Sequence, residues 1–219
     1  MFLDKMKKIK QMEIATLEEK YHINDWDLAT NMSKGRPFRS AIESTAFAVI
    51  AEVKPASPSK GVIAENVDPV AQALKYEQGG ANVISVLTET EYFHGKPQSL
   101  TNVQKAVSIP VLRKDFILHP LQVLESKFLG ADVILLIVAF LQPEECVNLA
   151  RLAHQLGMEV LIEIHEESEI DAAIRAEADV IGINNRNLQT LEVDLQTTAK
   201  LSSLLPNTFP IIGESGILS

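Results

Sequence analysis

The stretch that decides the fold is "IPVLRKDFILHPLQVLESKFLGADVILLIV", residues 109–138. Two apolar runs, 109–114 and 131–138, flank a segment that opens at Pro120 and closes at Gly130. Proline at the first position of a helix and glycine just past its last position are common helix boundaries. Strands that are apolar throughout and joined through a helix are typical of a parallel sheet covered by helices. The stretch therefore predicts a strand–helix–strand unit.

The same unit recurs along the chain after residue 45. The strand-like runs are 47–53, 81–87, 109–114, 131–138, 158–164, 178–183 and 209–214. The helix-like segments between them are 68–80, 97–108, 119–130, 142–157, 167–178 and 195–205. Even spacing, without a Gly-x-Gly-x-x-Gly turn after the first strand, favours a (β/α)8 TIM barrel over a doubly wound sheet.

The ends of the chain complete this α/β prediction. Residues 1–45 form an N-terminal helical extension: a helix over 3–20, a polar stretch, and then "GRPFRSAIES". Residues 46–219 supply barrel strands 1 to 7, so we expect a single domain over 1–219 that is C-terminally truncated after strand 7. An eighth strand would lie beyond Ser219 in the natural chain.

Composition restricts the classes of function. The chain has 219 residues and a formal net charge of −9, which disfavours nucleic acid and anionic membranes as partners. No apolar run approaches the roughly 18 residues of a membrane span. The single cysteine, Cys146, lies in a helical pattern, which indicates a packing role and fits the reducing cytoplasm. We expect a cytoplasmic protein, monomeric, that binds a small anionic molecule in a local pocket.

Charged residues gather at the predicted strand ends, where barrel enzymes build their active sites. Glu52 and Lys54 are two residues apart and therefore share one strand face. Other polar residues at strand ends are Lys114, Glu163, Asn184, Arg186 and Glu214. Each alone could be a solvated strand end, but several on one rim indicate function, because buried unpaired charges are costly. Neighbouring lysines and carboxylates can act as general acid and general base.

Histidine and metal chemistry are not expected. The sequence has no His/Cys/Asp cluster with the spacing of metal ligands. His165 is expected on the strand face opposite Glu163, as a packing or surface residue. None of the other histidines is assigned a chemical role.

The strand-end motifs carry a family resemblance. "AEVKPASPSKG" (51–61), "LRKDFI" (112–117), "LIEIH" (161–165), "GINNRNLQTLEVDL" (182–195) and "GESGI" (213–217) resemble those of indole-3-glycerol phosphate synthases. The resemblance implies a (β/α)8 barrel of tryptophan biosynthesis that needs neither cofactor nor metal. Its reaction is ring closure, decarboxylation and dehydration of 1-(2-carboxyphenylamino)-1-deoxyribulose 5-phosphate to indole-3-glycerol phosphate.

The resemblance also implies residue roles. Lys114 would be the general acid and Glu163 the general base. Lys54 would pair with the substrate carboxylate or act as a second proton donor. Glu52 and Glu214 would hold the lysines in place and charged. The remaining implied positions are Asn184 and Arg186 for substrate polar groups, Pro58, Phe93, Phe116, Leu135 and Leu188 for the aromatic ring, and Ser57, Ser215 and Gly216 for the phosphate.

One departure and two alternatives remain open. His119 stands where the family usually has Asp before the helix-opening Pro120, which predicts the loss of a helix cap worth ~1 kcal/mol. A related phosphate-binding barrel, phosphoribosylanthranilate isomerase, is one alternative, but its chemistry needs a Cys/Asp pair at strand ends. The other alternative is an inactive, truncated fragment that binds a phosphate ligand or a partner chain.

Overall fold

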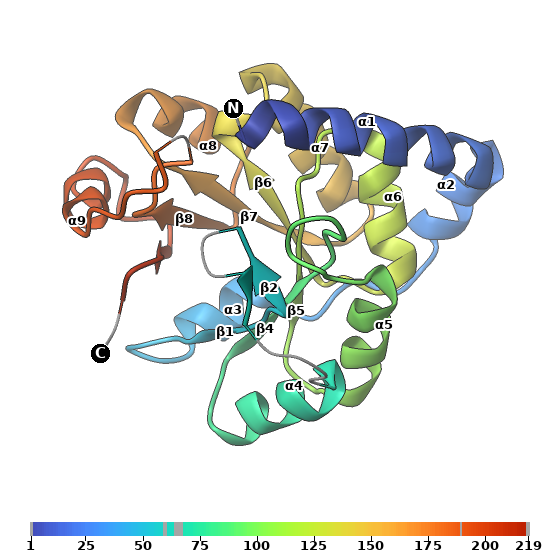
Figure 1. Cartoon of the computed structure of the whole chain (residues 1–219), viewed down its shortest axis with the longest axis horizontal. Helices are drawn as coiled ribbons and strands as arrows, with labels where there is room; N and C mark the ends of the chain where they lie inside the picture. Colours follow the sequence, from blue (N-terminus) through green and yellow to red (C-terminus); the bar gives the residue numbers. More distant parts are fainter. Residues whose placement is uncertain (1, 59–60, 64–67, 189, 218–219) are drawn as a thin grey trace.

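A single curled sheet organises the chain (Figure 1). The computed structural model describes residues 2–58, 61–63, 68–188 and 190–217. The sheet has seven parallel strands in the order β1-β4-β5-β6-β7-β8-β9. Their bounds are β1 Ile50–Val53, β4 Val83–Leu87, β5 Val111–Lys114, β6 Val133–Ile137, β7 Glu159–Ile164, β8 Val180–Asn184 and β9 Ile211–Glu214. All seven predicted strands are confirmed.

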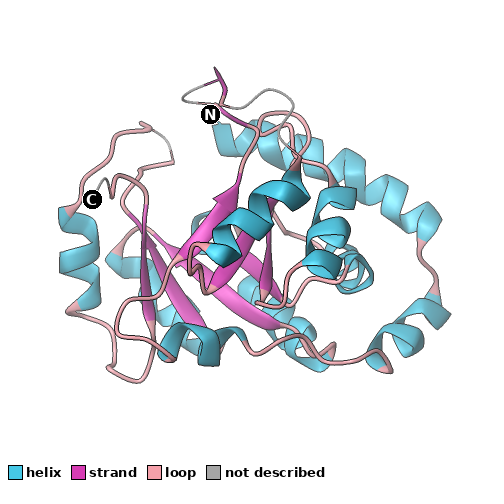
Figure 2. Cartoon of the chain, turned by 90° about the horizontal axis from the view of Figure 1, so that it is seen from below, coloured by secondary structure: helices cyan, strands magenta, loops and turns pink. Residues whose placement is uncertain are grey.

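Helices connect successive strands and cover the outer face of the sheet, as Figure 2 shows. They are α4 Pro69–Gln78, α5 Pro97–Ala106, α6 Pro120–Leu129, α7 Pro143–Gln155, α8 Ile170–Arg175 and α9 Gln196–Ser202, with short 3-10 helices at Val138–Phe140 (η1) and Glu167–Glu169 (η2). This is an α/β fold with a half-barrel sheet of the TIM-barrel kind.

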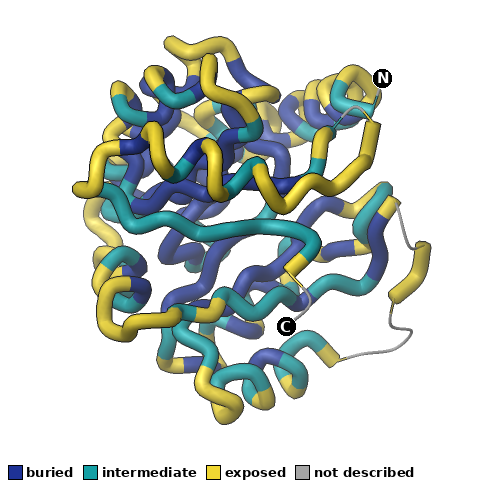
Figure 3. Tube along the Cα trace, turned by 90° about the vertical axis from the view of Figure 1, so that its left-hand side faces the viewer, coloured by how far each residue is buried: buried dark blue, intermediate teal, exposed yellow. Residues whose placement is uncertain are grey.

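The core has two layers, one on each face of the sheet. In β6, Ile134 and Leu136 pack outward with Cys146 of α7, whereas Leu135 packs inward with Phe140. The side chains on both faces of β6 are therefore buried, which explains why this strand is apolar throughout. Burying each such side chain contributes ~1.5–3 kcal/mol. Figure 3 shows the buried strands inside a shell of exposed helical turns.

Three helices precede the first strand of the sheet: α1 Phe2–Lys20, α2 Ile23–Thr30 and α3 Phe38–Glu43. The predicted polar stretch after residue 20 contains α2, a helix that the sequence pattern did not predict. The Phe2 ring contacts the rings of Tyr92 and Phe116, which follow strands, so α1 begins at their C-terminal ends. At the opposite ends, the Arg39 backbone N–H donates to Glu159 at the start of β7. The N-terminal helices therefore contact both ends of the sheet.

The start of α6 corrects another prediction. His119 Nδ1 accepts a hydrogen bond from the Leu121 N–H (3.3 Å), and the Gln122 side chain accepts one from the His119 N–H (3.1 Å). The expected loss of a cap at His119 is wrong, because an imidazole nitrogen can accept this bond as a carboxylate would.

A small hairpin follows β1. Its strands, β2 Ala56–Ser57 and β3 Gly61–Val62, pair antiparallel and carry Ser57 toward the C-terminal end of the sheet. The sequence pattern did not predict it. Among the described helices, none combines the length and apolar character required for a bilayer span.

Candidate active site

One cavity collects the predicted site residues. It has a volume of about 1220 Å³, follows the inner face of the sheet and reaches the C-terminal ends of the strands. Lys54 and Lys114 both line it. So do the other predicted residues, namely Glu52, Ser57, Pro58, Phe93, Phe116, Leu135, Glu163, Asn184, Arg186, Leu188, Glu214, Ser215 and Gly216. Residues from widely separated parts of the chain thus meet at one site.

Lys114, the last residue of β5, lies at the centre of the charged part of this cavity. Its Nζ is 3.4 Å from Glu163 Oε2 on β7 and 2.5 Å from Glu214 Oε2 on β9. The Asn184 side-chain amide, at the end of β8, donates to Glu163 Oε1 at 3.0 Å. One ammonium therefore bridges two carboxylates, and an amide fixes the orientation of one of them.

These contacts and burial shift the pKa values of Lys114, Glu163 and Glu214. Burial lowers the pKa of Lys114, but Glu214, Glu163 and Glu52 together raise it above its usual range. Burial raises the pKa of Glu163, yet Lys114, His165 and Asn184 bring it down to about 2. Burial raises the pKa of Glu214 to about 7, against the opposing effect of Lys114. The site holds a charged proton donor, an ionised base and a carboxyl that titrates near neutrality.

Glu52 and Lys54 form a second pair on the same rim. The Lys54 ammonium contacts the Glu52 carboxylate directly, as expected for residues two apart on a strand face. Ser85 Oγ lies 3.5 Å from the other Glu52 oxygen. The Lys54 side chain is 34% exposed, so it can reach a ligand in the cavity.

His165 was wrongly expected on the face opposite Glu163. Its Nε2 lies 3.2 Å from Glu163 Oε1, and the side chain is only 12% exposed. Residues two apart share a face, so the strand period itself was the signal that should have placed it there. Burial lowers the pKa of His165, but Glu163 and Glu169 raise it to about 9. His165 thus adds a second positive group beside the base.

Aromatic side chains form one wall of the cavity. The Phe93 and Phe116 ring centroids are 6.2 Å apart, and Phe116 meets Phe140 edge-on at 5.4 Å. Phe2 of α1 also lines the cavity and contacts Phe116 at 5.9 Å. No pattern in the sequence indicates Phe2, because its place depends on how α1 packs over the sheet.

The loops after β8 and β9 shape the opposite side. Arg186 donates its backbone N–H to Asn184 Oδ1 at 3.0 Å, and its guanidinium donates to the Leu191 carbonyl at 2.8 Å. Ser215 and Gly216 are both left-handed, with φ of 64° and 76°. A Cβ on Gly216 would lie 2.5 Å from Val193 Cγ1, so this turn requires glycine. Consecutive backbone N–H groups in such turns suit an anion.

The described residues include no group of three or more His, Cys, Asp or Glu side chains placed to hold a metal ion. Cys146 is buried in α7 within the outer core cluster, which confirms its predicted packing role, and burial raises the pKa of its thiol to about 12. The isomerase alternative therefore lacks its cysteine at a strand end.

A curled parallel sheet with paired lysines and carboxylates at its strand ends, beside an aromatic wall, defines a barrel-type acid–base enzyme. The sequence profile described as "Indole-3-glycerol phosphate synthase" matches residues 3–219. The chain belongs to this family, and it is accordingly an enzyme, a carboxy-lyase of tryptophan biosynthesis.

Individual relatives agree with this assignment. The chain is 45% identical to the indole-3-glycerol phosphate synthase of Sulfurimonas denitrificans, over 99% of the chain and 84% of that protein. It is 48% identical to that of Bordetella pertussis, over 84% of the chain and 71% of that protein. A solved structure titled "Native KDPGal structure" matches with a TM-score of 0.54 at 17% identity, over 79% of this chain and 74% of that one, and supports the fold alone.

Proposed function

We propose that this cavity converts 1-(2-carboxyphenylamino)-1-deoxyribulose 5-phosphate to indole-3-glycerol phosphate. One observation carries the proposal: the Lys114 ammonium lies between Glu163 and Glu214 inside a cavity that also holds the Lys54–Glu52 pair. Such a site can donate a proton, accept a proton and hold an anion without moving any strand.

The substrate's two ends match two sides of the cavity. Phe93, Phe116 and the nearby Pro58, Leu135 and Leu188 would cover the aryl ring, whose burial favours binding. Ser57 and the Ser215–Gly216 turn would contact the phosphate. Arg186 and Asn184 would orient the polar groups of the sugar between them.

Ring closure requires a proton donor at the ribulose carbonyl oxygen. As the ring carbon that bears the carboxylate attacks the carbonyl carbon, Lys114 would protonate the oxygen, which becomes a hydroxyl. The carbon–carboxylate bond then breaks, CO₂ leaves, and the bonding electrons restore the ring. Lys54 would pair with that carboxylate beforehand or act as a second proton donor.

Dehydration completes the indole. The hydroxyl would accept a proton from a lysine ammonium of the cavity and leave as water, while Glu163 would take the proton lost from the neighbouring carbon, whose bonding electrons form the new ring double bond. Positive charge that develops on the ring nitrogen would be stabilised by Glu52, Glu163 and Glu214. Glu214 would hold Lys114 in place and keep it charged between steps.

We also propose the finer description of the fold and its setting. The curled sheet is part of a (β/α)8 barrel, residues 1–45 are its N-terminal helical extension, and residues 1–219 belong to one domain. Met6 of α1 and Phe38 of α3 support this, because both pack in the same cluster as Leu135 of the sheet. We propose a cytoplasmic monomer whose partner is its small phosphorylated substrate.

Replacement of Lys114 by Met tests the proposal. Lys114→Met should lower kcat by at least about 10²-fold, because it removes the proton donor, and indole absorbance after substrate addition measures the rate. Lys200→Met, at an exposed position of α9 outside the cavity, is the matched control and should keep the wild-type rate. Wild-type turnover in Lys114→Met would overturn the assignment. A silent wild-type protein would instead support the inactive-fragment alternative.

A further inference from the structure

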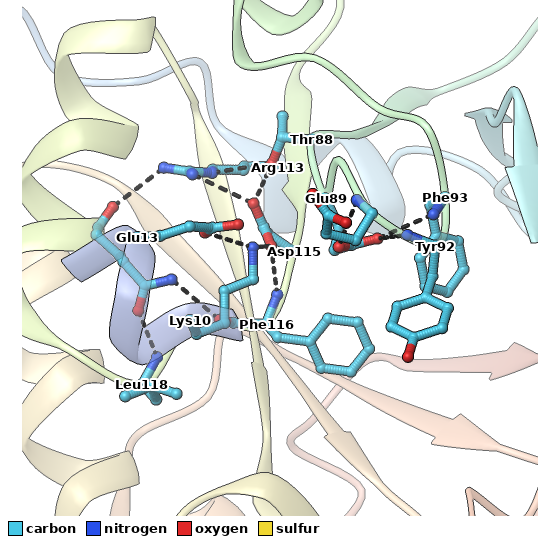
Figure 4. A network of polar contacts seen from close by, with 12 residues as sticks. Lys10, Glu13, Thr88, Glu89, Tyr92, Phe93, Arg113, Asp115, Phe116 and Leu118 are labelled. Atoms are coloured by element: carbon cyan, nitrogen blue, oxygen red, sulfur yellow. Dashed lines mark hydrogen bonds and ion pairs between the residues drawn. The ribbon is translucent and has the colours of Figure 1, made fainter. Parts of the chain in front are cut away.

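Glu89 is a fully buried carboxylate that the proposed mechanism does not use. It lies two residues past β4, with 0% of its surface exposed. Its Oε1 accepts a hydrogen bond from the Glu91 N–H at 2.8 Å. Its Oε2 accepts from the N–H groups of Tyr92 (2.8 Å) and Phe93 (2.9 Å), as Figure 4 shows. Three backbone donors thus satisfy one buried charge.

These three bonds hold the loop that carries an aromatic wall residue. The loop runs from β4 to α5 and belongs to no ladder, so Glu89 provides the partners that its N–H groups need. The loop then returns to its own start, where the Gly95 N–H donates to the Glu89 carbonyl at 2.7 Å. A Cβ on Gly95 would lie 2.3 Å from the Leu87 carbonyl oxygen, so the loop has little room to shift.

The loop also contacts the hairpin on the phosphate side of the cavity. The Phe93 carbonyl accepts a hydrogen bond from the Ala56 N–H at 3.2 Å, directly before Ser57. The Phe93 ring lines the cavity beside Phe116. Glu89 therefore fixes, through one segment of backbone, the position of a ring and the anchor of a neighbouring strand.

We propose that Glu89 is a positioning residue for the aryl end of the substrate, acting through Phe93. The inference rests on the proposed function. It adds that Glu89, through Phe93, sets the affinity of the cavity for the aryl end of the substrate. A carboxylate is required, because all three of its partners are donors and an amide would place an NH₂ group, with two N–H donors, where one acceptor oxygen stands. Lys114 and its carboxylates lie outside this network, so Glu89 acts on binding rather than on proton transfer.

Glu89→Gln tests the inference through the separation of KM from kcat. KM should rise about tenfold, as expected for loss of hydrogen bonds to a charged group, while kcat stays within about twofold. Asp132→Asn is the matched control, because Asp132 is also buried and accepts N–H groups from Arg36 and Val111 at the other ends of the strands. The control should lower Tm and leave KM unchanged.

A double-mutant cycle tests whether Glu89 acts through Phe93. Phe93→Leu alone should raise KM, and adding Glu89→Gln should then raise KM by a smaller factor than it does in the wild-type protein. An equal effect of Glu89→Gln in both backgrounds would overturn the inference. If Glu89→Gln does not fold, Glu89→Asp serves instead, since it keeps the charge and shortens the reach; a wild-type KM in that variant would also overturn it.

A binding measurement separates this inference from the proposed function. Calorimetric titration with indole-3-glycerol phosphate should show weaker binding to Glu89→Gln than to the wild-type protein. Equal binding to both proteins overturns the proposed role of Glu89 and leaves the proposed function standing. A wild-type protein that neither binds this compound nor turns over the substrate overturns the proposed function itself.

Discussion

At the residue scale, the ionisation of Glu214 in the site affects the stability of the folded protein. The half-buried Glu214 carboxylate lies beside Glu163, and Lys114 is the cation that both share. Because the pKa of Glu214 is raised from 4.5 to about 7, the folded state favours its protonated form. The stability that this gives is fully present below about pH 4.5 and is lost as pH rises through about 7. Ionisation of Glu214 above about pH 7 therefore lowers the free energy of unfolding.

Glu214→Gln should therefore raise stability and lower activity. At pH 8 the variant should be more stable than wild type by about 1–3 kcal/mol, because it has no buried charge to form there. At pH 5 the two should be similar. Urea unfolding at both pH values measures this, and kcat should fall because Lys114 loses its nearest partner. Equal stabilities at pH 8 would contradict the prediction.

The raised pKa of His165 predicts a dependence of stability on pH with the same sign, over a higher pH range. Its pKa is raised from 6.5 to about 9 by Glu163 and Glu169, which outweigh burial. Its contribution to stability is fully present below about pH 6.5 and is lost as pH rises through about 9. His165→Gln should be less stable than wild type at pH 6 and approach it at pH 10. Melting curves of both proteins across this range test the prediction, and a constant difference in stability would count against it.

At the scale of elements, one lysine joins α1 to the sheet. Lys10 is 1% exposed, and its Nζ lies 2.7 Å from Asp115 Oδ1. Asp115 also accepts from Thr88 Oγ1 at 2.5 Å and from the Arg113 guanidinium at 3.2 Å (Figure 4). Since Asp115 lies between Lys114 and Phe116, the contact links α1 to two residues that line the cavity.

Lys10→Met should destabilise the protein by about 3–5 kcal/mol, because it breaks a buried ion pair and leaves Asp115 under-compensated. Lys8→Met, at an exposed position of the same helix, should have little effect. Lys10 and Arg113 hold the pKa of Asp115 at about 2 against burial. The stability that comes from this lowered pKa of Asp115 is present above about pH 3.8 and is lost as pH falls through about 2. Lys10→Met should shift acid unfolding, followed by circular dichroism, to higher pH; an unchanged midpoint would argue against this role.

At the scale of the molecule, the sequence predicted regular elements better than their contacts. The strands begin and end within three residues of the predicted bounds, because β-branched runs and Pro/Gly boundaries are local signals. The cavity collects the predicted strand-end residues because parallel strands all end at one edge. Their catalytic roles stay predictions.

Networks that join distant segments were not predicted. Lys10 and Glu89 sit in ordinary polar surroundings in the sequence, and only tertiary packing buries them. The contact of Arg36 was not predicted either: its guanidinium donates a hydrogen bond to Asp132, which lies 96 positions further along the chain. The hairpin β2–β3 has strands of two residues each, which is too short for any periodicity to appear.

The pairing of Lys114 with Glu214 has a consequence during biosynthesis. The two residues are 100 positions apart in the chain. At ribosomal speeds of about 5–20 residues per second, roughly 5–20 s separate their translation. Throughout that interval a nascent chain carries an ammonium without its nearest counter-charge. The charged cluster around Lys114 is therefore complete only after β9 has left the ribosome.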